Sequence, residues 1–266
     1  MKDPMPGKSG ITPAAKKALI VIPTYNEREN IQEMVPMIMG GRVPEWQFEI
    51  LVVDSNSPDG TGKVLDEMKA RIPGLHVFHQ TEKLGLGKAY LDGFRYLEES
   101  LGRAYDAVFT MDADFSHHPR YLPAMLQKLE TCDLVVGSRY TPGGRLENWP
   151  WHRKVLSRFA NFYAKMLTGV PVHDLTAGFH CFKRETLRKV LKLQHLFIDA
   201  EGYAFLIELK FLTTYLGYRV GEVPVIFADR TKGQSKISKR VIFESALIPW
   251  KCLGNRIGLW WRKRKK

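Results

Sequence analysis

The sequence predicts an α/β fold in which helices cover both faces of a mostly parallel central sheet. Short apolar, β-branched runs alternate along the chain with stretches whose apolar residues recur at helical spacing. Each apolar run stops abruptly at a polar loop, which is typical of buried parallel strands that end at one edge of a sheet. The chain has 266 residues, 44% of them hydrophobic, and no internal repeat, so we expect one large domain.

The first half of the chain follows this alternation closely. Strands are predicted at residues 18–22, 48–53, 75–78, 108–111 and 133–137. The first two intervening helices are marked by Ile31, Met34, Val35 and Ile38, and by Val64, Leu65, Met68 and Ile72. A third helix, from about 89 to 101, follows the glycine-rich segment 85–88. That segment is not a dinucleotide fingerprint, because Tyr90 stands where the third glycine belongs and the first strand does not precede it.

A helix predicted at residues 153–167 carries two contrasting faces. Arg153, Ser157 and Asn161 recur at intervals of four on one face. An arginine and a serine one turn apart would suit a phosphate, whereas an ordinary solvated helix face is the simpler interpretation. The other face is wide and apolar, with Val155, Leu156, Phe159, Phe162, Tyr163, Met166 and Leu167.

A late strand is predicted at residues 219–227, where Pro224 indicates an edge position or a bulge. It runs into the polar loop 228–236, which includes Arg230 and Lys236 and suits a loop that closes over a bound phosphate.

The two ends of the chain differ from this central domain. Residues 1–15 are rich in Pro, Gly and Lys and lack the apolar core of a secretion signal, so we expect a disordered leader. Residues 239–266 are too often interrupted by charge and proline to span a bilayer, which takes about 20 apolar residues. Their tryptophans and basic tail predict an amphipathic helix at a membrane surface, with a core-packing helix at 241–253 as the alternative.

Charge and cysteine content narrow the choice of partners. The formal charge of +12 points to nucleic acid, an acidic membrane surface or phosphorylated substrates. Strand-end aspartates would repel a nucleic-acid backbone, so we expect no nucleic-acid partner. Three cysteines far apart in the sequence, Cys132, Cys181 and Cys252, suggest neither a disulfide framework nor a zinc site, and favour a reducing, cytoplasmic compartment.

Two carboxylates follow the strand at 108–111 directly, namely Asp112 and Asp114. Aspartates one residue apart can share a hard cation such as Mg²⁺ or Mn²⁺ that also holds a diphosphate. Taken alone, the pair is equally compatible with a solvated strand end. The neighbouring His117 and His118 precede Pro119 at a predicted helix start, which favours turn or capping roles over metal binding.

Seven motifs follow one another along the chain. They are Pro23–Asn30, Ser57–Thr61, Leu84–Tyr90, Met111–Pro119, Gly137–Tyr140, Glu201–Phe205, and Glu222–Val225 continuing through Asp229 and Arg230 to Gly233, Ser235 and Lys236. With these motifs the chain resembles the family 2 glycosyltransferases of the GT-A fold, and within them the dolichol-phosphate or polyprenol-phosphate mannose synthases. The resemblance covers residues 18–245 and implies a Rossmann-like GT-A domain at 16–238.

The resemblance also implies roles for individual residues. Asp112 and Asp114 match the metal and diphosphate signature and, with Arg139, Arg230 and Lys236, form the expected catalytic group. The residues expected to bind the donor nucleotide are Pro23, Tyr25, Glu27, Val53, Asp54, Ser55, Ala113 and Asp114. The residues expected to hold the acceptor phosphate are Arg139, Arg153 and Ser157, which favours the functional interpretation of the polar face at 153–167.

Two positions depart from the family pattern. Ser55 stands where most members have a second aspartate after the strand, and His180 follows Ala177-Gly178-Phe179 where many have a basic residue. The first departure concerns recognition of the nucleobase, and neither alters the aspartate pair.

The activity implied by the resemblance is inverting transfer of mannose from GDP-mannose to polyprenyl (dolichyl) phosphate, with Mg²⁺ or Mn²⁺. The product would be a β-mannosyl phosphoryl polyprenol. A sister enzyme that uses UDP-glucose is the alternative. The chain resembles the subgroup without transmembrane segments, which implies a peripheral position on the cytosolic face of a membrane, with or without small membrane-protein subunits.

Overall fold

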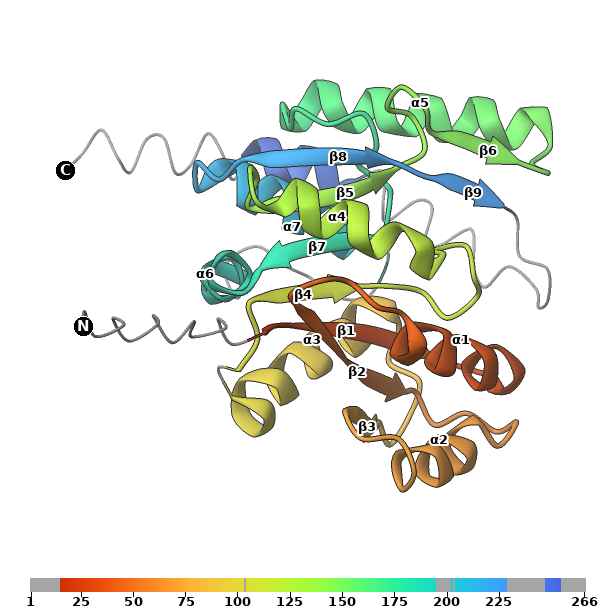
Figure 1. The fold of residues 1–266 in the computed structure, drawn as a ribbon. Helices are drawn as coiled ribbons and strands as arrows, with labels where there is room; N and C mark the ends of the chain where they lie inside the picture. The colour runs from red at the N-terminus through yellow and green to blue at the C-terminus, as the bar shows by residue number, and fades with distance from the viewer. Residues whose placement is uncertain (1–14, 103, 195–201, 203, 229–246, 255–266) are drawn as a thin grey trace, which may run out of the picture.

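The computed structural model describes residues 15–102, 104–194, 202, 204–228 and 247–254, and its centre is a seven-stranded sheet (Figure 1). The strand order is β3-β2-β1-β4-β7-β5-β8, and β6 and β9 form a separate two-stranded sheet. The strands are β1 (Lys16–Thr24), β2 (Trp46–Asp54), β3 (Leu75–His79), β4 (Ala107–Thr110), β5 (Leu134–Ser138), β6 (Arg145–Glu147), β7 (His180–Lys183), β8 (Val220–Pro224) and β9 (Ile226–Ala228). The helices are α1 (Arg28–Gly40), α2 (Thr61–Lys69), α3 (Leu86–Tyr96), α4 (Leu122–Leu129), α5 (Trp151–Thr168), α6 (Arg184–Gln194) and α7 (Ala204–Tyr215), with a π-helical turn at Leu97–Leu101 and a 3₁₀ turn at Pro119–Tyr121.

The predicted mostly parallel sheet is confirmed, with one exception. Strands β1, β2, β3 and β4 run parallel, as do β5 and β8, whereas β7 is antiparallel to both β4 and β5. Chain order reverses between β1 and β4, which lie side by side with β2 on the far side of β1. Such a switch point opens a crevice at the carboxyl ends of the strands, where ligands bind in open α/β folds.

Helices pack on both faces of the sheet, which explains why the strands are apolar throughout rather than alternating. In β1, Leu19 and Val21 join one buried cluster, and Ile20 and Ile22 join the other. The first cluster takes side chains from α3, α6 and α7, and the second takes them from α1 and α4.

The late strand is shorter than predicted and is split in two. Pro224 ends β8, which is an edge strand of the large sheet as expected, and β9 continues on the other sheet beside β6. A proline has no N–H to donate to a ladder, so the chain changes sheets at this point.

The ends of the chain are described only in part. The predicted leader lies outside the described residues except for residue 15. Of the segment 239–266, residues 247–254 are helical, with Ile248 and Cys252 buried in the core and Leu247 and Trp250 exposed. Within the described ranges, no helix has the length and apolar character required to cross a bilayer.

Candidate active site at the carboxyl ends of the strands

The loops that follow β1 and β2 are joined into one unit. Backbone N–H groups of the first loop donate to side chains of the second: Asn26 to Ser57 Oγ (3.0 Å), Glu27 to Thr61 Oγ1 (3.1 Å) and Arg28 to Asp59 Oδ2 (3.3 Å). Burial raises the pKa of Asp59, but hydrogen bonds from Thr61 outweigh it and lower this pKa below its usual value. Two loops held by such bonds form a preorganised wall at the sheet edge.

The expected donor-binding residues of the first loop lie on this wall. Pro23 is the penultimate residue of β1, and the Tyr25 ring has the Lys83 ammonium 3.9 Å from its centroid. Glu27 Oε2 accepts a hydrogen bond from Asn30 Nδ2 (2.7 Å). A half-buried aromatic ring beside a cation suits a nucleotide, which combines a planar base with anionic phosphates.

The donor-binding residues predicted at the end of β2 are buried and have internal partners. Asp54 accepts hydrogen bonds from Ser57 N (3.1 Å) and Ser57 Oγ (2.5 Å). Ser55 donates to Gln80 Oε1 (2.8 Å), and Gln80 Nε2 donates to Asp92 Oδ2 (2.8 Å). An aspartate at position 55 would place a carboxylate at each end of the Gln80 amide, but an amide can donate only through its nitrogen, and its oxygen needs a donor. A serine at position 55, rather than the family's aspartate, therefore matches the Gln80–Asp92 pairing. Val53, the penultimate residue of β2, is fully buried in the core.

The aspartate pair follows β4 at the switch point. Asp112 is partly exposed, its N–H donates to His117 Nδ1 (2.9 Å), and Tyr90 OH lies 3.5 Å from its Oδ1. Asp114 is buried beside Ala113 and accepts hydrogen bonds from Ser116 N (3.1 Å) and Ser116 Oγ (2.5 Å). Phe115 adopts a positive φ of 61°, which gives the tight turn that brings Ser116 back onto Asp114.

The turn and capping roles predicted for the two histidines are confirmed. His118 caps the 3₁₀ turn by accepting a hydrogen bond from Arg120 N, and His117 holds the backbone of Asp112 and stacks on Phe179 at 5.0 Å. A Cβ at Gly178 would lie 3.3 Å from His117 Cε1. Glycine at this position therefore lets the segment that leads into β7 pack closely against the loop of Asp112 and His117.

The donor set fits a divalent ion that is shared with a ligand. In the described parts of the chain, no three His, Cys, Asp or Glu side chains gather as a complete protein cage. Mg²⁺ is usually bound through one or two carboxylates together with substrate phosphates and water. Asp112 and Asp114 match that pattern, because both are carboxylates on one short loop at the strand end.

His180, the second departure from the family pattern, is a buried structural residue. It lies in β7, and its Nδ1 is 3.0 Å from Thr110 Oγ1, which donates to the Gly178 carbonyl (2.7 Å). Burial holds the pKa of His180 well below its usual value, so the ring is neutral. It therefore supports the end of β4 instead of contributing a charge at the sheet edge.

The cationic side of the site begins at Arg139, directly after β5. Its Nε and Nη2 bind the two oxygens of Asp174 (both 2.7 Å), and Nη2 also donates to Thr176 Oγ1 (2.6 Å). Burial acts to lower the pKa of Arg139, but Asp174 outweighs it and raises this pKa, so the guanidinium stays charged. Nη1 has no hydrogen-bonding partner among the described residues, which leaves two donors for an anion. The aromatic rings around Arg139 are those of Tyr140, Trp149 and Phe227.

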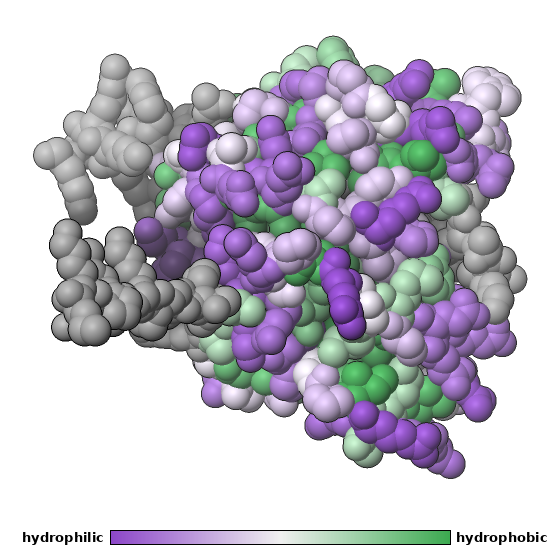
Figure 2. All heavy atoms as spheres, in the orientation of Figure 1, coloured by the Kyte–Doolittle hydropathy of each residue, from purple (hydrophilic) through white to green (hydrophobic). Residues whose placement is uncertain are grey.

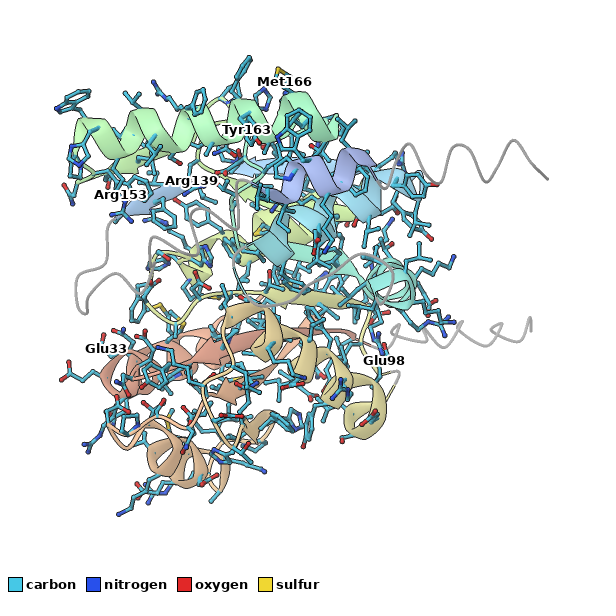
Figure 3. All side chains as sticks on the ribbon, turned by 180° about the vertical axis from the view of Figure 1, so that it is seen from behind. Glu33, Glu98, Arg139, Arg153, Tyr163 and Met166 are labelled. Atoms are coloured by element: carbon cyan, nitrogen blue, oxygen red, sulfur yellow. The ribbon has the colours of Figure 1, made fainter. Side chains whose placement is uncertain are left out.

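The polar row of α5 faces the protein rather than solvent. The Arg153 guanidinium lies 3.7 Å from the Trp149 ring centroid, and Ser157 Oγ accepts a hydrogen bond from Tyr140 OH (2.7 Å). Asn161 is buried and exchanges two hydrogen bonds with Thr176. The solvated interpretation of this row is therefore wrong. Figure 3 shows Arg139 and Arg153 together on the side of α5 that faces the sheet. The predicted Arg230 and Lys236 lie outside the described residues.

Sequence reasoning missed the residues that position these cations. Asp174 binds Arg139 from 35 residues away. Lys210 in turn holds the Asp174 loop, because its Nζ donates to the carbonyls of Leu175 (2.9 Å) and Ala177 (2.7 Å). Burial lowers the pKa of Lys210 to about 7. Asp174, Lys210 and the loop residue Trp149, whose ring lies against Arg153, are isolated in the sequence and belong to no recognisable spacing. Their roles are therefore visible only in the folded chain.

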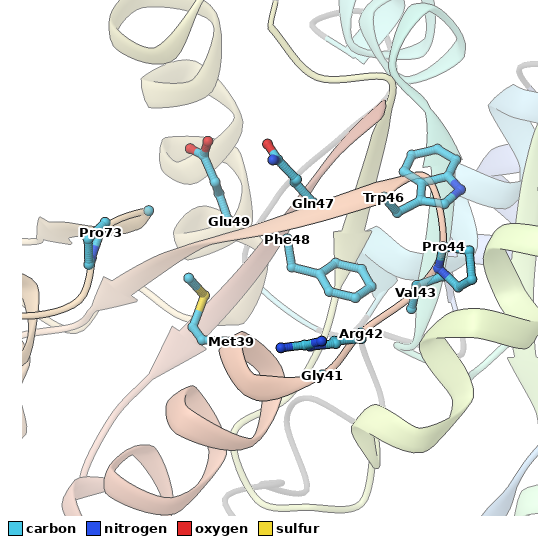
Figure 4. A pocket seen from close by; sticks show the side chains of 11 residues that line it. Met39, Gly41, Arg42, Val43, Pro44, Trp46, Gln47, Phe48, Glu49 and Pro73 are labelled. Carbon is cyan, nitrogen blue, oxygen red and sulfur yellow. The ribbon is translucent and has the colours of Figure 1, made fainter. Parts of the chain in front are cut away.

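Two hollows on the surface lie away from this site. One of about 740 Å³ is an open groove between the α1–β2 connection and the amino-terminal part of β2, lined among others by Met39, Arg42, Trp46 and Phe48 (Figure 4). The other, of about 480 Å³, is lined by Tyr105 and Arg184 among others, also beside strand starts. Neither includes a residue of the aspartate pair or of the cationic side.

Solved structures with a similar fold include complexes of a bacterial synthase. Glucosyl-3-phosphoglycerate synthase from Mycobacterium tuberculosis, in a complex with Mn²⁺, UDP and glucosyl-3-phosphoglycerate, superposes with a TM-score of 0.59 and 21% identity over 92% of this chain and 81% of that one. Its complex with Mg²⁺ and UDP gives a TM-score of 0.58 and 22% identity over 92% and 80% of the two chains. These similarities establish the GT-A fold.

Sequence relatives are considerably closer. The polyprenol monophosphomannose synthase of Mycolicibacterium smegmatis is 45% identical over 86% of this chain and 84% of its own length. The undecaprenyl-phosphate mannosyltransferase of Micrococcus luteus is 41% identical over 91% of this chain and 100% of its own length. The family model of "Glycosyl transferase family 2" matches residues 19–191. The chain therefore belongs to glycosyl transferase family 2.

Proposed function

We propose that this glycosyltransferase moves mannose from GDP-mannose to a polyprenyl phosphate, with inversion at the anomeric carbon. One observation carries the proposal: a carboxylate pair at the end of β4 is combined with a guanidinium group after β5 and another on α5. The carboxylate pair suits a diphosphate bound through a divalent cation, and the two guanidinium groups suit the phosphate of an acceptor. Both sequence relatives are named for mannosyl transfer onto a polyprenol carrier, which supports the same acceptor here.

The acceptor chemistry explains why the site needs cations rather than a strong base. A phosphate monoester has its second pKa near 6 and is largely dianionic at neutral pH, so its oxygen is already a nucleophile. The difficulty is the approach of this anion to an anionic donor. Arg139, through Nη1, together with Arg153 and the Ser157 hydroxyl would hold the acceptor phosphate and offset the repulsion.

Transfer would then proceed by direct displacement. A phosphate oxygen forms a bond to the anomeric carbon while the bond from that carbon to the donor diphosphate breaks, and GDP leaves with the electron pair. Attack from the face opposite the leaving group turns an α-linked donor into a β-mannosyl phosphoryl lipid. Asp112 and Asp114 would hold Mg²⁺ or Mn²⁺, which offsets the charge that develops on the leaving diphosphate.

The donor would lie along the wall formed by the loops after β1 and β2. Tyr25 and Glu27 occupy the switch point next to the aspartate pair, and Asp54 and Ser55 lie behind them at the end of β2. Since the Asp54 and Ser55 side chains are bound internally, they would shape the base pocket by holding its loops in place. Arg230 and Lys236, outside the described residues, are proposed to engage the diphosphate or the acceptor phosphate.

We also propose a peripheral position on the cytosolic face of a membrane, with small membrane subunits as candidate partners and no nucleic acid. The lipid acceptor requires access to a bilayer, and the three free, buried cysteines suit a reducing compartment.

The test is incubation with labelled GDP-mannose, a divalent ion and a polyprenyl phosphate, followed by butanol extraction. We expect label in the lipid phase. Label from UDP-glucose but none from GDP-mannose would overturn the assignment of GDP-mannose as donor and favour the sister glucosyltransferase. UDP-glucose is included because a similar solved structure contains UDP. No lipid-borne label from either donor would overturn the acceptor.

A further inference from the structure

The outward side of α5 is apolar and exposed to an unusual degree. Its large side chains have exposed fractions of 77% for Trp151, 58% for Val155, 56% for Leu156, 63% for Phe159, 66% for Phe162 and 64% for Met166. Among the described residues, five other large apolar side chains are exposed to 36% or more, and they lie on other segments: Met37, Leu84, Leu216, Leu247 and Trp250. In Figure 2 apolar side chains reach the surface along the upper rim, where Figure 1 shows α5, and Figure 3 shows Met166 on the outer side of this helix.

This arrangement inverts the usual amphipathic helix. A surface helix normally turns its apolar stripe to the core and its polar face to water. In α5 the polar row of Arg153, Ser157 and Asn161 turns inward to Trp149, Tyr140 and Thr176. Contiguous exposed apolar patches of this kind mark surfaces that contact a partner or a membrane.

The charges of α5 indicate which partner it contacts. Its 18 residues include Arg153, Lys154, Arg158 and Lys165 and no carboxylate. A bilayer with anionic headgroups attracts such a helix, and a tryptophan with phenylalanines on the apolar side suits the boundary between headgroups and acyl chains. A second copy paired through α5 would bring cations against cations, because no acidic side chain on the helix is available to compensate.

We propose that the outward face of α5 inserts into the headgroup region of an anionic bilayer, and that this insertion places the acceptor phosphate site at headgroup level. The occupant of the face is a lipid surface. The placement of the acceptor phosphate site rests on the proposed function, whereas the insertion of the α5 face does not. Arg153 and Ser157 are on the same helix as Phe159 and Phe162, on the opposite side. A helix about 10 Å in diameter that lies in the interface therefore holds its inner cations close to the depth of lipid phosphates.

The first experiment measures binding of the full chain, without any sugar donor, to sedimented vesicles of phosphatidylcholine with or without phosphatidylglycerol. The test variant is Phe159→Ser with Phe162→Ser, and the matched control is Met37→Ser with Leu216→Ser, which removes two exposed apolar side chains from other elements. We expect the test variant to lose at least about tenfold in affinity for anionic vesicles, since each buried phenylalanine contributes strongly to interfacial binding. The control should bind as the parent does.

Two results would overturn the docking surface. One is unchanged binding of the α5 variant while Leu247→Ser with Trp250→Ser abolishes binding, because the segment 247–254 would then be the contact. The other is a stable dimer of the parent in vesicle-free sedimentation that the α5 variant dissociates, because a second copy would then cover the face. If Phe159→Ser with Phe162→Ser lowers the melting temperature, Leu156→Asn with Met166→Gln replaces it in the same comparison.

A second measurement separates this inference from the proposed function. With a short-chain, water-soluble prenyl phosphate and no vesicles, the α5 variant should transfer mannose at the parental rate, whereas transfer to a vesicle-borne polyprenyl phosphate should fall about tenfold or more. Equal losses with both acceptors would overturn the positioning clause. Absence of transfer by the parent itself would count against the proposed function, while the donor-free vesicle assay would still decide the docking surface.

Discussion

The two ends of the central sheet both carry charged groups, but they use them differently. Near the amino ends of the strands, Glu49 contacts Lys17 (2.9 Å), His76 (2.9 Å) and the Tyr105 hydroxyl (2.6 Å). At the carboxyl ends, the aspartates after β4 are held by neutral groups such as Ser116, and the guanidinium groups of Arg139 and Arg153 lie on the neighbouring elements.

The difference separates charges that pair with one another at the amino ends from charges at the carboxyl ends for which we propose ligands. Burial acts to raise the pKa of Glu49, yet the hydrogen bonds from Tyr105, His76 and Lys17 lower it to about 2. At the carboxyl ends, we propose that a divalent ion binds the two aspartates and that an anionic substrate contacts the two guanidinium groups. Apart from the buried Arg139–Asp174 pair, substitutions at the amino ends should therefore affect stability, and substitutions at the carboxyl ends should affect activity.

The largest effect is expected from Asp174→Asn, which tests the buried Arg139–Asp174 ion pair at the carboxyl ends of the strands. Removing one partner of a buried pair leaves an uncompensated charge on Arg139 and costs about 3–5 kcal/mol. The free energy of unfolding should fall by that amount in a urea titration, and transfer should be lost with it. A fall below about 1 kcal/mol would show that Arg139 finds another partner.

Asp114→Asn should abolish most activity with little effect on stability. The amide can still accept the hydrogen bonds from Ser116 but cannot supply the charge that holds a divalent ion, so we expect a loss of about 100-fold or more in kcat. The rate is measured with excess Mg²⁺ or Mn²⁺, with the melting temperature as control. A near-parental rate would contradict the metal assignment.

Arg153→Ala should raise the KM for the acceptor about tenfold, which corresponds to roughly 1.4 kcal/mol for a lost charge-assisted contact, and leave the KM for GDP-mannose within a factor of about two. The matched control is Arg158→Ala, which removes an exposed arginine of the same helix. Both are measured with a water-soluble acceptor, so that membrane binding does not enter. Equal changes in the two substrates would place Arg153 outside the acceptor site.

Glu49→Gln should act on stability alone and with the smallest effect. The pKa of Glu49 is about 4.5 when unfolded and about 2 when folded, so its charge stabilises the fold fully above pH 4.5. That contribution is lost as the pH falls toward 2. With partial exposure to water, we expect a deficit of about 1 kcal/mol for the variant at pH 7 that vanishes near pH 2. Urea titrations at several pH values measure it, and a deficit independent of pH would contradict the assignment.

Much of the fold and part of the site could be predicted because they depend on local pattern. Apolar runs that stop at polar loops predicted the parallel strands, and the position of Asp112 and Asp114 directly after such a run placed the pair at the sheet edge. The antiparallel β7 was not predicted, because its sequence, His-Cys-Phe-Lys, contains no β-branched residue and no continuous apolar run.

The orientation of α5 shows what the sequence could not decide. Hydrophobic periodicity divides a helix into two faces, and the sequence by itself determined which residues share each face. It does not state which face turns to the protein, because that depends on partners such as Trp149, Tyr140 and Thr176, which meet the helix only in the folded chain. The pairing of Arg139 with Asp174, 35 residues apart, has the same cause. Local sequence determined the strand-end carboxylates, and tertiary packing alone decided where the cations and the apolar face of α5 point.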